Sequence, residues 1–301
     1  MYKWLATHTA KLGAPHARKL AEHAIRLGAM VSASTPPHSL RRNVMGLSFP
    51  SPIGLAAGFD KQGTLYQHLS PLGFGFAEIG SVIPQPEQQR SPGMDAVAFT
   101  LAQYIRPHAI PLGVSISMNR MTPPQRMHHD YLIGMEKFWQ LADYITVNLG
   151  VRAGPDLHLP EHRATLYTVL TAIKDKQVHM MTESGRACPI VVKIDQDRCD
   201  TNNLLACVRD YAFDGLMLSG GTHRNEENTP LVNLQRVASS LNWNIPIISV
   251  GGIRTPQDAA DRLSAGASLL QIYSGLVEFG PRLPQLMNLH LSRLDAQTSL
   301  R

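Results

Sequence analysis

The chain has 301 residues, of which 44% are hydrophobic and 17% charged, as in a globular protein with one large core or two smaller ones. Its net charge of +5 favours an anionic ligand or an anionic membrane surface, but no run of lysine and arginine is dense enough to indicate nucleic acid. No stretch is apolar and long enough to cross a bilayer.

The N-terminus lacks the apolar core of a signal peptide, because Lys11, Arg18 and other polar residues interrupt it. The cysteines, Cys188, Cys199 and Cys207, are odd in number and form no metal-ligand pair, so we expect no metal site. They are typical of a reducing compartment. We therefore expect a cytoplasmic protein. A peripheral position on the inner face of the cell membrane is the alternative.

Residues 1–30 are predicted to be helical and amphipathic, because apolar residues recur at helical spacing with basic residues between them. The apolar positions are Ala17, Leu20, Ala21, Ala24 and Leu27. Trp4 and the basic residues are typical of a helix at a lipid surface, and a helix packed on its own domain explains the pattern equally well. Residues 31–39 have the composition of a linker. We predict an N-terminal helical segment and linker over 1–40 and a second domain over 41–301.

Short apolar runs recur after the linker and alternate with segments of helix length. The runs predict strands at Ile53–Gly58, Phe76–Val82, Ile110–Ser117, Tyr144–Gly150, Pro189–Asp195, Gly215–Gly220, Ile245–Gly252 and Leu269–Gly275. Predicted helices between them include Arg163–Gln177, Asn202–Tyr211, Leu231–Leu241 and Pro256–Ala265. Strands alternating with helices in this way favour a (β/α)₈ TIM barrel, and a doubly wound sheet is the alternative.

The first predicted strand runs into small residues and then a lysine. Ala56, Ala57 and Gly58 leave the backbone uncovered, so that a flat ligand can lie against it. Lys61 follows at the carboxyl end of the strand, where barrels hold their chemistry. A buried strand with a tight turn and a solvated lysine is the simpler interpretation.

The ends of the last two predicted strands have the features of a phosphate cradle. Gly251 and Gly252 permit close approach to the backbone, and Tyr273 and Ser274 can add hydroxyl or amide donors. Many barrels bind a phosphate with the loops that follow strands seven and eight. Together these strand ends predict a phosphate-bearing ligand.

Five segments of the chain resemble the dihydroorotate dehydrogenase family, in its quinone-linked, membrane-associated class. They are Gly54–Gly63, Gly73–Val82, Asp130–Lys137, Val250–Ile253 and Gly266–Gly275. The resemblance implies a flavoprotein of pyrimidine biosynthesis, with FMN in a TIM barrel and an N-terminal helical domain that admits a quinone from the membrane. In that family a serine base takes a proton from dihydroorotate, the flavin takes a hydride, and quinone reoxidises the flavin.

The resemblance assigns flavin contacts residue by residue. The matching positions are Ala57, Gly58, Lys61, Ser81, Asn148, Lys193, Gly251, Gly252, Tyr273 and Ser274. Lys61 matches the lysine that faces both flavin and substrate. Asn148 matches the substrate-binding asparagine that ends the fourth strand.

The positions that the resemblance assigns to dihydroorotate itself are replaced. Val151 stands where the serine base is expected, and valine has no ionisable proton. Ala153 and Gly220 replace asparagines that bind the substrate, and Ser115 replaces an asparagine near the flavin. The family's Asn-Arg-Met-Gly-Phe-Asn loop has no counterpart in residues 96–110. A loop that supports the phosphate is also shortened, so we expect weaker FMN binding than in the family.

Three functional hypotheses follow. The first is an FMN-dependent oxidoreductase that acts on another substrate. The second is a non-catalytic relative that serves as a partner subunit or ligand sensor, and the third is dihydroorotate oxidation itself, with quinone as acceptor. His158, His162 and His223 lie in loops where a replacement base could stand, although a loop histidine is more often a solvated side chain. Arg152 suits a substrate anion but cannot act as a base at ordinary pH.

Overall fold

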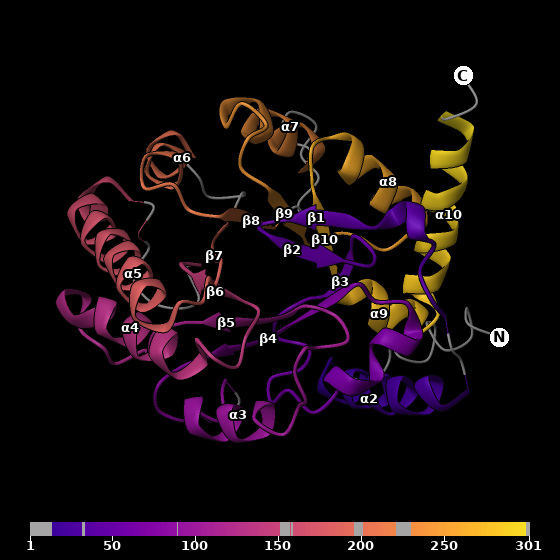
Figure 1. Ribbon diagram of the computed structural model, residues 1–301, viewed down its shortest axis with the longest axis horizontal. Helices are drawn as coiled ribbons and strands as arrows, with labels where there is room; N and C mark the ends of the chain where they lie inside the picture. Colours follow the sequence, from indigo (N-terminus) through magenta and orange to yellow (C-terminus); the bar gives the residue numbers. More distant parts are fainter. Residues whose placement is uncertain are drawn as a thin grey trace.

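A computed structural model describes residues 14–31, 34–88, 90–150, 157, 159–195, 201–220 and 230–298. Eight parallel strands close into a barrel in the order β10-β3-β4-β5-β6-β7-β8-β9, with helices around them (Figure 1). The TIM barrel predicted from the strand pattern is therefore confirmed, and the doubly wound sheet is excluded.

All eight predicted strands are present, most of them shorter than predicted. They are β3 (Ile53–Leu55), β4 (Phe76–Val82), β5 (Leu112–Ile116), β6 (Tyr144–Asn148), β7 (Ile190–Asp195), β8 (Gly215–Ser219), β9 (Ile247–Val250) and β10 (Leu269–Ile272). The predicted strand residues that do not belong to the observed strands lie mostly at the carboxyl ends. There, small residues leave the hydrogen-bonded sheet and enter the loops. Those loops carry most of the predicted site.

Two glycines make room for aromatic rings inside the barrel. A Cβ atom on Gly54 would lie 2.4 Å from the Phe76 ring, and one on Gly113 would lie 2.2 Å from the Tyr144 ring. Each glycine and its aromatic partner lie on neighbouring strands in direct register. Glycine at these positions is thus a packing requirement, since close-packed interiors leave no space for another atom.

The antiparallel hairpin of β1 (Arg42–Val44) and β2 (Leu47–Phe49) closes the amino-terminal end of the barrel. Its buried Val44 and Phe49 pack on residues near the starts of the strands, including Phe76 and Tyr144. The sequence analysis did not predict this hairpin. Met45 and Gly46 both have positive φ, at 55° and 74°, as a tight hairpin turn requires.

The predicted helices are present, but the helix that starts at Arg163 extends seven residues beyond the predicted end at Gln177, and residues 1–13 of the predicted N-terminal helix, with Trp4, lie outside the described residues. The bounds of the helices are α2 (Ala14–Val31), α3 (Met94–Leu101), α4 (Met127–Phe138), α5 (Arg163–Ser184), α6 (Thr201–Asp210), α7 (Pro230–Ser240), α8 (Pro256–Ser264), α9 (Ser274–Phe279) and α10 (Leu283–Thr298). Helix α8 starts as expected, because Thr255 and Asp258 form a capping box around Pro256. Short 3₁₀ turns η1 (His38–Leu40), η2 (Tyr66–His68), η3 (Ser70–Leu72), η4 (Pro124–Arg126) and η6 (Pro160–His162) complete the connections.

Helix α2 lies against the barrel beside η2, η3 and α9 (Figure 1). It buries Ala21 and Ile25, and Arg26 donates a 3.1 Å hydrogen bond to Thr64 Oγ1 in the loop after β3. The opposite side of the helix exposes Leu20 and Leu27. Among the described residues, no helix has the length and apolar character needed to span a bilayer.

Candidate functional site

The turn after β3 is built on the buried carboxylate of Asp60. Its two oxygens accept hydrogen bonds from the backbone N–H groups of Gln62, Gly63, Thr64 and Leu65, at 2.8 to 3.3 Å. Burial raises the pKa of Asp60, and these amides oppose that rise. This hydrogen-bonded turn fixes the position of Lys61 at the mouth of the barrel.

Lys61 is half-buried, and it lies close enough to Arg18 of α2 for the two charges to repel. Burial lowers the pKa of Lys61, and the Arg18 guanidinium lowers it further. Both effects disfavour the charged form of Lys61.

Three predicted polar residues meet at the ends of β4, β5 and β6. Asn148 Nδ2 donates a 2.7 Å hydrogen bond to Ser81 Oγ, which lies 3.0 Å from Ser115 Oγ. Asn148 Oδ1 also accepts a 3.1 Å bond from the backbone N–H of Gly150. The structure therefore joins Ser81 and Asn148 directly, and Ser115 extends the chain of contacts.

Beneath this chain lies Glu78, which the sequence analysis missed. Its Oε2 atom accepts bonds from Tyr144 (3.1 Å), Thr146 (3.0 Å) and Gln271 (2.9 Å), and its side chain is fully buried. Burial raises its pKa, and the positive charge of Lys193 is the largest opposing influence. The available signal was one carboxylate inside the apolar run Phe76–Val82.

The phosphate cradle predicted at β9 and β10 is formed by closely packed backbone. Gly251 has φ of 107°, and a Cβ atom there would lie 2.3 Å from the Gly220 carbonyl oxygen. Arg262 of α8 donates to Gly251 O (3.1 Å) and Ser249 Oγ (3.0 Å), which holds this strand end in place. Gly251, Gly252 and Ser274 are half-buried and Tyr273 is exposed, so solvent reaches this region in the described part of the chain.

The ends of β3 and β10 are also brought together. The Phe59 and Tyr273 rings pack edge to face with centroids 5.4 Å apart, and Gly58 N–H donates to Gly80 O. A Cβ atom on Gly58 would approach only Tyr273, at 3.7 Å, which leaves space above this backbone beside Ala57. The predicted flavin positions at these strand ends thus lie at one mouth.

These observations are compatible with FMN. A half-buried glycine pair with positive φ is present where a phosphate would bind, and open backbone lies at Gly58 where a flat ring could rest. Lys61 and Lys193 would supply positive charge to an anionic cofactor bound at this mouth.

A cavity of about 650 Å³ lies beside Lys61, between α2 and the loops that follow β3 and β4. Among its described lining residues, Lys61 is the only one of the ten predicted site positions, so the cavity is offset from the cradle at Gly251. Its lining includes Arg18, Glu22 and Arg90. We call it the α2 cavity.

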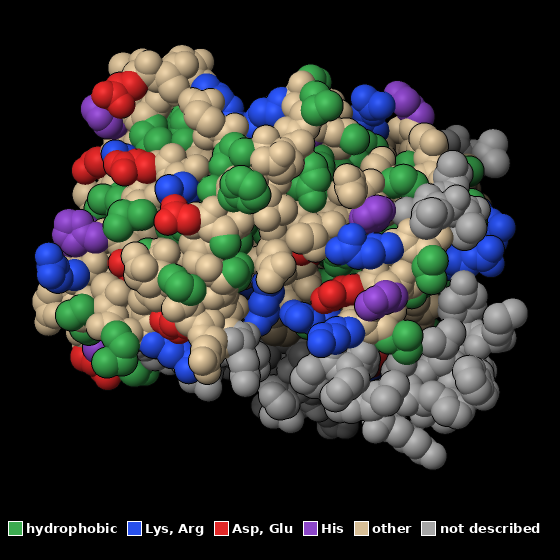
Figure 2. Space-filling view, turned by 90° about the horizontal axis from the view of Figure 1, so that it is seen from below, with side chains coloured by type: hydrophobic (Ala, Val, Ile, Leu, Met, Phe, Trp, Pro, Cys, Tyr) green, Lys and Arg blue, Asp and Glu red, His purple; other side chains and the backbone are tan. Residues whose placement is uncertain are grey.

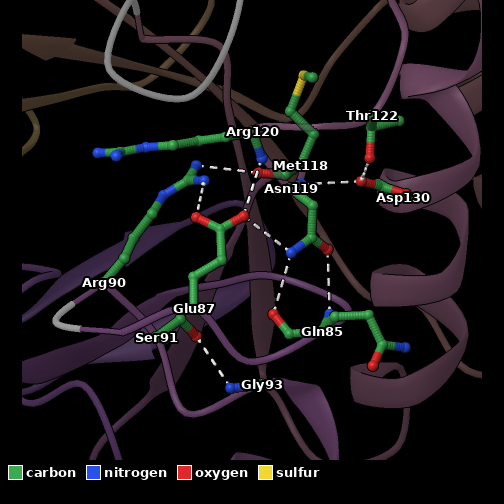
Figure 3. Close-up of polar contacts among 10 residues, drawn as sticks. All are labelled: Gln85, Glu87, Arg90, Ser91, Gly93, Met118, Asn119, Arg120, Thr122 and Asp130. Carbon is green, nitrogen blue, oxygen red and sulfur yellow. Dashed lines mark hydrogen bonds and ion pairs between the residues drawn. The ribbon is translucent and has the colours of Figure 1, made fainter.

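A network of side chains holds the loop after β4 at this cavity (Figure 3). Glu87 Oε2 forms a 2.9 Å ion pair with Arg90, and Glu87 Oε1 accepts 2.9 Å bonds from Asn119 Nδ2 and Arg120 N. Arg90 also donates to Met118 O at 2.9 Å. Burial by itself would raise the pKa of Glu87, but the backbone N–H of Arg120 and the side chains of Arg90 and Asn119 together lower it.

Several residues singled out in the sequence fall outside the described residues. They are Val151, Arg152, Ala153, His158, Cys199 and His223, together with most of the shortened loop at Glu226–Pro230. His162 is described and lies in η6, directly before α5. Residues 96–110 hold most of α3 and a short connection to β5. Cys188 and Cys207 are buried free thiols.

The fold and the strand ends define a TIM barrel with a candidate phosphate site at its mouth. The chain matches the family model described as dihydroorotate dehydrogenase over residues 39–90 and 218–293. It is 33% identical to the dihydroorotate dehydrogenase (quinone) of Shewanella denitrificans, covering 80% of this chain and 83% of that protein. It is 34% identical to the protein of the same name from Azotobacter vinelandii, covering 80% and 81%. The chain belongs to the dihydroorotate dehydrogenase family, which confirms the resemblance seen in the sequence.

Solved structures agree on the fold. The ferulenol complex of the Eimeria tenella DHODH superposes with a TM-score of 0.80 at 23% identity, covering 93% of this chain and 92% of that chain. The ligand-free form of the same protein gives a TM-score of 0.78 at 24% identity, covering 93% and 95%.

Proposed function

We propose that this protein is an FMN-dependent oxidoreductase that acts on a small molecule other than dihydroorotate. The observation that carries the proposal is the sequence at the end of β6, where Asn148 is followed by Leu149, Gly150 and Val151. Valine occupies the place that the family resemblance gives to a serine base. This side chain cannot take a proton, which supports a different chemistry at the substrate.

The proposed cofactor residues are those predicted from the sequence. Gly251, Gly252, Tyr273 and Ser274 would hold the phosphate, and Ala57, Gly58 and Lys61 would lie along the ring system. Lys193 and the Ser81–Asn148 pair would border the ring from β4, β6 and β7. When bound, FMN supplies the capacity to accept a hydride, and the protein supplies orientation and charge.

The extent of the family match supports a changed substrate. The family model matches residues 39–90 and 218–293. The stretch between these two ranges, residues 91–217, is unmatched. That stretch contains Ser115, Val151 and Ala153, three of the replaced positions, whereas the proposed cradle at Gly251 lies within the matched part. Eight of the ten proposed cofactor positions lie in the matched part, whereas Asn148 and Lys193 lie outside it and the replaced position Gly220 lies inside it.

A non-catalytic relative, acting as partner subunit or ligand sensor, is the second candidate. The observation that favours it is the engagement of Asn148, whose amide already bonds to Ser81 Oγ and to Gly150 N. A side chain satisfied within the protein has less reason to bind a substrate. Dihydroorotate oxidation with quinone as acceptor is the third candidate, supported by the names of the curated relatives.

The visible spectrum of the purified protein separates the first two candidates. Flavin bands, or their appearance after reconstitution with FMN, are expected for an oxidoreductase. A colourless protein that takes up no FMN at high concentration would favour the non-catalytic candidate.

Anaerobic bleaching of the FMN-loaded protein by dihydroorotate tests the third candidate. We expect slow bleaching for the wild type and for Val151→Ser, because loss of a general base costs about 10²–10⁴-fold and one serine leaves Ala153 and Gly220 unrepaired. Rapid bleaching of the wild type would show that another group acts as base. Rapid bleaching of the variant alone would show that one residue separates this site from the family's activity.

We also propose a peripheral membrane contact through residues 1–30, with quinone as electron acceptor. Exposed Leu20 and Leu27 on α2 support this contact, because apolar residues beside Lys19 suit an anionic lipid surface. Sedimentation with anionic liposomes should fall for the double variant Leu20→Gln/Leu27→Gln. Leu289→Gln on α10, which is similarly exposed, is the matched control. Equal sedimentation of both variants and the wild type would remove this proposal.

A further inference from the structure

We propose that Glu78 is held as a neutral carboxylic acid inside the barrel, where its Oε1–H group donates a hydrogen bond to Oε1 of Gln271. We call this arrangement the acid–amide pair. In it Glu78 is a positioning residue, because it fixes the side chain of Gln271 on β10, two residues before Tyr273 of the proposed cradle. The inference goes beyond the proposed function and does not depend on which ligand the mouth binds.

Glu78 belongs to a polar layer in the barrel interior. Toward the amino-terminal ends of the strands lie apolar side chains that include Phe76, Tyr144, Val191 and Leu269. Side chains two residues apart on a strand point to the same face of the sheet. The residues two positions further along these strands are Glu78, Thr146, Lys193 and Gln271. A carboxyl group, a hydroxyl, an ammonium and an amide thus meet inside the barrel, beneath the mouth.

Two buried oxygen atoms of this layer have no hydrogen-bond partner in the described part of the chain. Glu78 Oε2 accepts hydrogen bonds from Tyr144, Thr146 and Gln271 Nε2, whereas Glu78 Oε1 accepts none from the described residues. Gln271 Oε1 is unpaired among the same residues. An unsatisfied buried polar atom is costly, so each one needs an explanation. Here both atoms belong to the two groups that already share a 2.9 Å bond.

One proton would satisfy both oxygens. An ionised carboxylate and an amide oxygen are both acceptors, so they cannot bond to each other. A protonated carboxyl group has one O–H donor. With the proton on Oε1, Glu78 and Gln271 can bond twice, through Oε1–H to the amide oxygen and through the amide Nε2–H to Oε2. Burial favours this neutral form, because it raises the pKa of Glu78.

An ionised Glu78 that faces the ammonium group of Lys193 is the alternative. Lys193 is the largest influence toward the ionised form, yet the pKa of Glu78 stays raised because burial outweighs it. Figure 2 shows other carboxylates of this protein at the surface, with lysine or arginine side chains nearby. Water reaches those groups, whereas Glu78 is fully buried. Ionisation would also leave Oε1 without a donor among the described residues, so the neutral form accounts for more of the contacts.

The acid–amide pair ties distant strands together across the interior. Strand β3 lies between β4 and β10 in the barrel, so Glu78 and Gln271 bond past the strand that separates them. Strand β10 then continues to Tyr273 at the mouth. A neutral Glu78 also does not cancel the positive charge of Lys193, which lies in register with Asn148. Protonation of Glu78 would therefore affect both the position of these strand ends and their attraction for an anionic ligand.

Infrared difference spectroscopy on the purified full chain tests the protonation of Glu78. A protonated carboxyl group gives a C=O band at higher frequency than an ionised carboxylate, and that band shifts down in D2O. Near neutral pH we expect such a band in the wild type and its loss in Glu78→Gln. Glu183→Gln, at an exposed residue that pairs with His179, should leave the band unchanged. Absence of the band from the wild type, or its survival in Glu78→Gln, would overturn the proposal.

Gln271→Met tests the pairing while it leaves Glu78 in place. The thioether side chain has a similar length and lacks both the amide donor and the amide oxygen. The carboxyl band should remain and shift to higher frequency, because its C=O group loses one donor. An unchanged frequency would overturn the pairing. The exchange variant Glu78→Gln/Gln271→Glu keeps one acid and one amide, so it should restore the band that Glu78→Gln loses, and a folded exchange variant without the band would contradict the pair.

Lys193→Met separates the neutral acid from the ionised alternative. A neutral Glu78 does not need the ammonium group, so the band should be as strong as in the wild type. If Glu78 is ionised in the wild type, loss of the Lys193 charge would favour protonation, and the band would appear only in the variant. That outcome would assign the two residues to an ion pair and overturn the acid–amide pair. Circular dichroism checks that each variant is folded before its spectrum is compared.

Discussion

The side-chain amide of Asn148 donates a 2.7 Å hydrogen bond to the hydroxyl of Ser81, and so ties the end of β6 to the end of β4. The same side chain accepts the backbone N–H of Gly150 at 3.1 Å, where the chain leaves the barrel. Asn148 is therefore part of the framework of the mouth, whatever ligand it meets.

We predict that Asn148→Ala lowers the free energy of unfolding by about 1–3 kcal/mol, because two hydrogen bonds of about 0.5–1.5 kcal/mol each are lost. Urea unfolding followed by circular dichroism measures this change. Ser81→Ala removes the bond to Asn148 and the 3.0 Å contact with Ser115 Oγ, so its cost is expected to fall in the same range. The double variant should cost less than the sum of the single ones, since both remove the same contact. Strict additivity would show that the Ser81 bond contributes nothing to stability.

Gly251→Ala should abolish FMN uptake and destabilise the barrel. The new Cβ atom would lie 2.3 Å from Gly220 O, and φ of 107° adds backbone strain of about 1–3 kcal/mol. Gly185→Ala is the matched control, because Gly185 also has positive φ but no atom within 4 Å of a new Cβ. Flavin absorbance after reconstitution and thermal unfolding are the measurements. Normal flavin uptake by Gly251→Ala would place the phosphate elsewhere.

Asp60→Asn should destabilise the protein by about 1–3 kcal/mol, because an amide has one accepting oxygen and would leave backbone donors unsatisfied. Asp60 Oδ1 and Oδ2 both accept N–H groups now, so either orientation of the asparagine loses contacts. Asp210→Asn, at an exposed ion pair with Arg209, should change stability little. Chemical unfolding compares them, and equal effects would contradict the role assigned to Asp60.

Glu78→Gln should become more stabilising, relative to wild type, as the pH rises. The pKa of Glu78 is raised in the folded protein, so the unfolded chain loses this proton first, near the ordinary value of 4.5. Stability that depends on Glu78 is therefore lost as the pH rises from that value toward the folded-state pKa. Glutamine does not titrate, and it keeps an oxygen for the donors from Tyr144, Thr146 and Gln271.

Unfolding free energies measured from about pH 4 to pH 8 test the prediction for Glu78. Glu183→Gln is the control, because Glu183 is exposed and pairs only with His179 at 3.2 Å among the contacts described for it. A pH-independent difference between Glu78→Gln and wild type would show that Glu78 titrates normally.

The barrel was predictable because apolar runs and helix-length segments alternate along the chain, and strands such as β4 occur where the pattern placed them. The β1–β2 hairpin was missed, because three-residue strands give too little alternation to recognise. The positions of Lys61 and Asn148 followed from their place at strand ends. Their role in binding remains a prediction.

The α2 cavity could not be predicted from the sequence. Arg18, Lys61 and Arg90 are far apart in the chain, and only the packing of α2 beside the loops brings them to one space. The same holds for Glu78 and Gln271, which are joined by a 2.9 Å hydrogen bond between β4 and β10. Contacts of this kind depend on the order of the strands around the closed barrel. A local sequence pattern contains no information about that order.

The packing of Phe76 over Gly54, and of Tyr144 over Gly113, restricts how this barrel can evolve. Replacing either glycine by a larger residue requires that its aromatic partner be replaced by a smaller side chain at the same time. Either change alone would create a clash or a void. Each pair is therefore expected to be inherited as a unit and to change by two coupled steps. Coupled pairs also occur at the mouth, where Asn148 bonds to Ser81 and Gly251 packs on the Gly220 carbonyl oxygen, so those pairs are expected to change together as well.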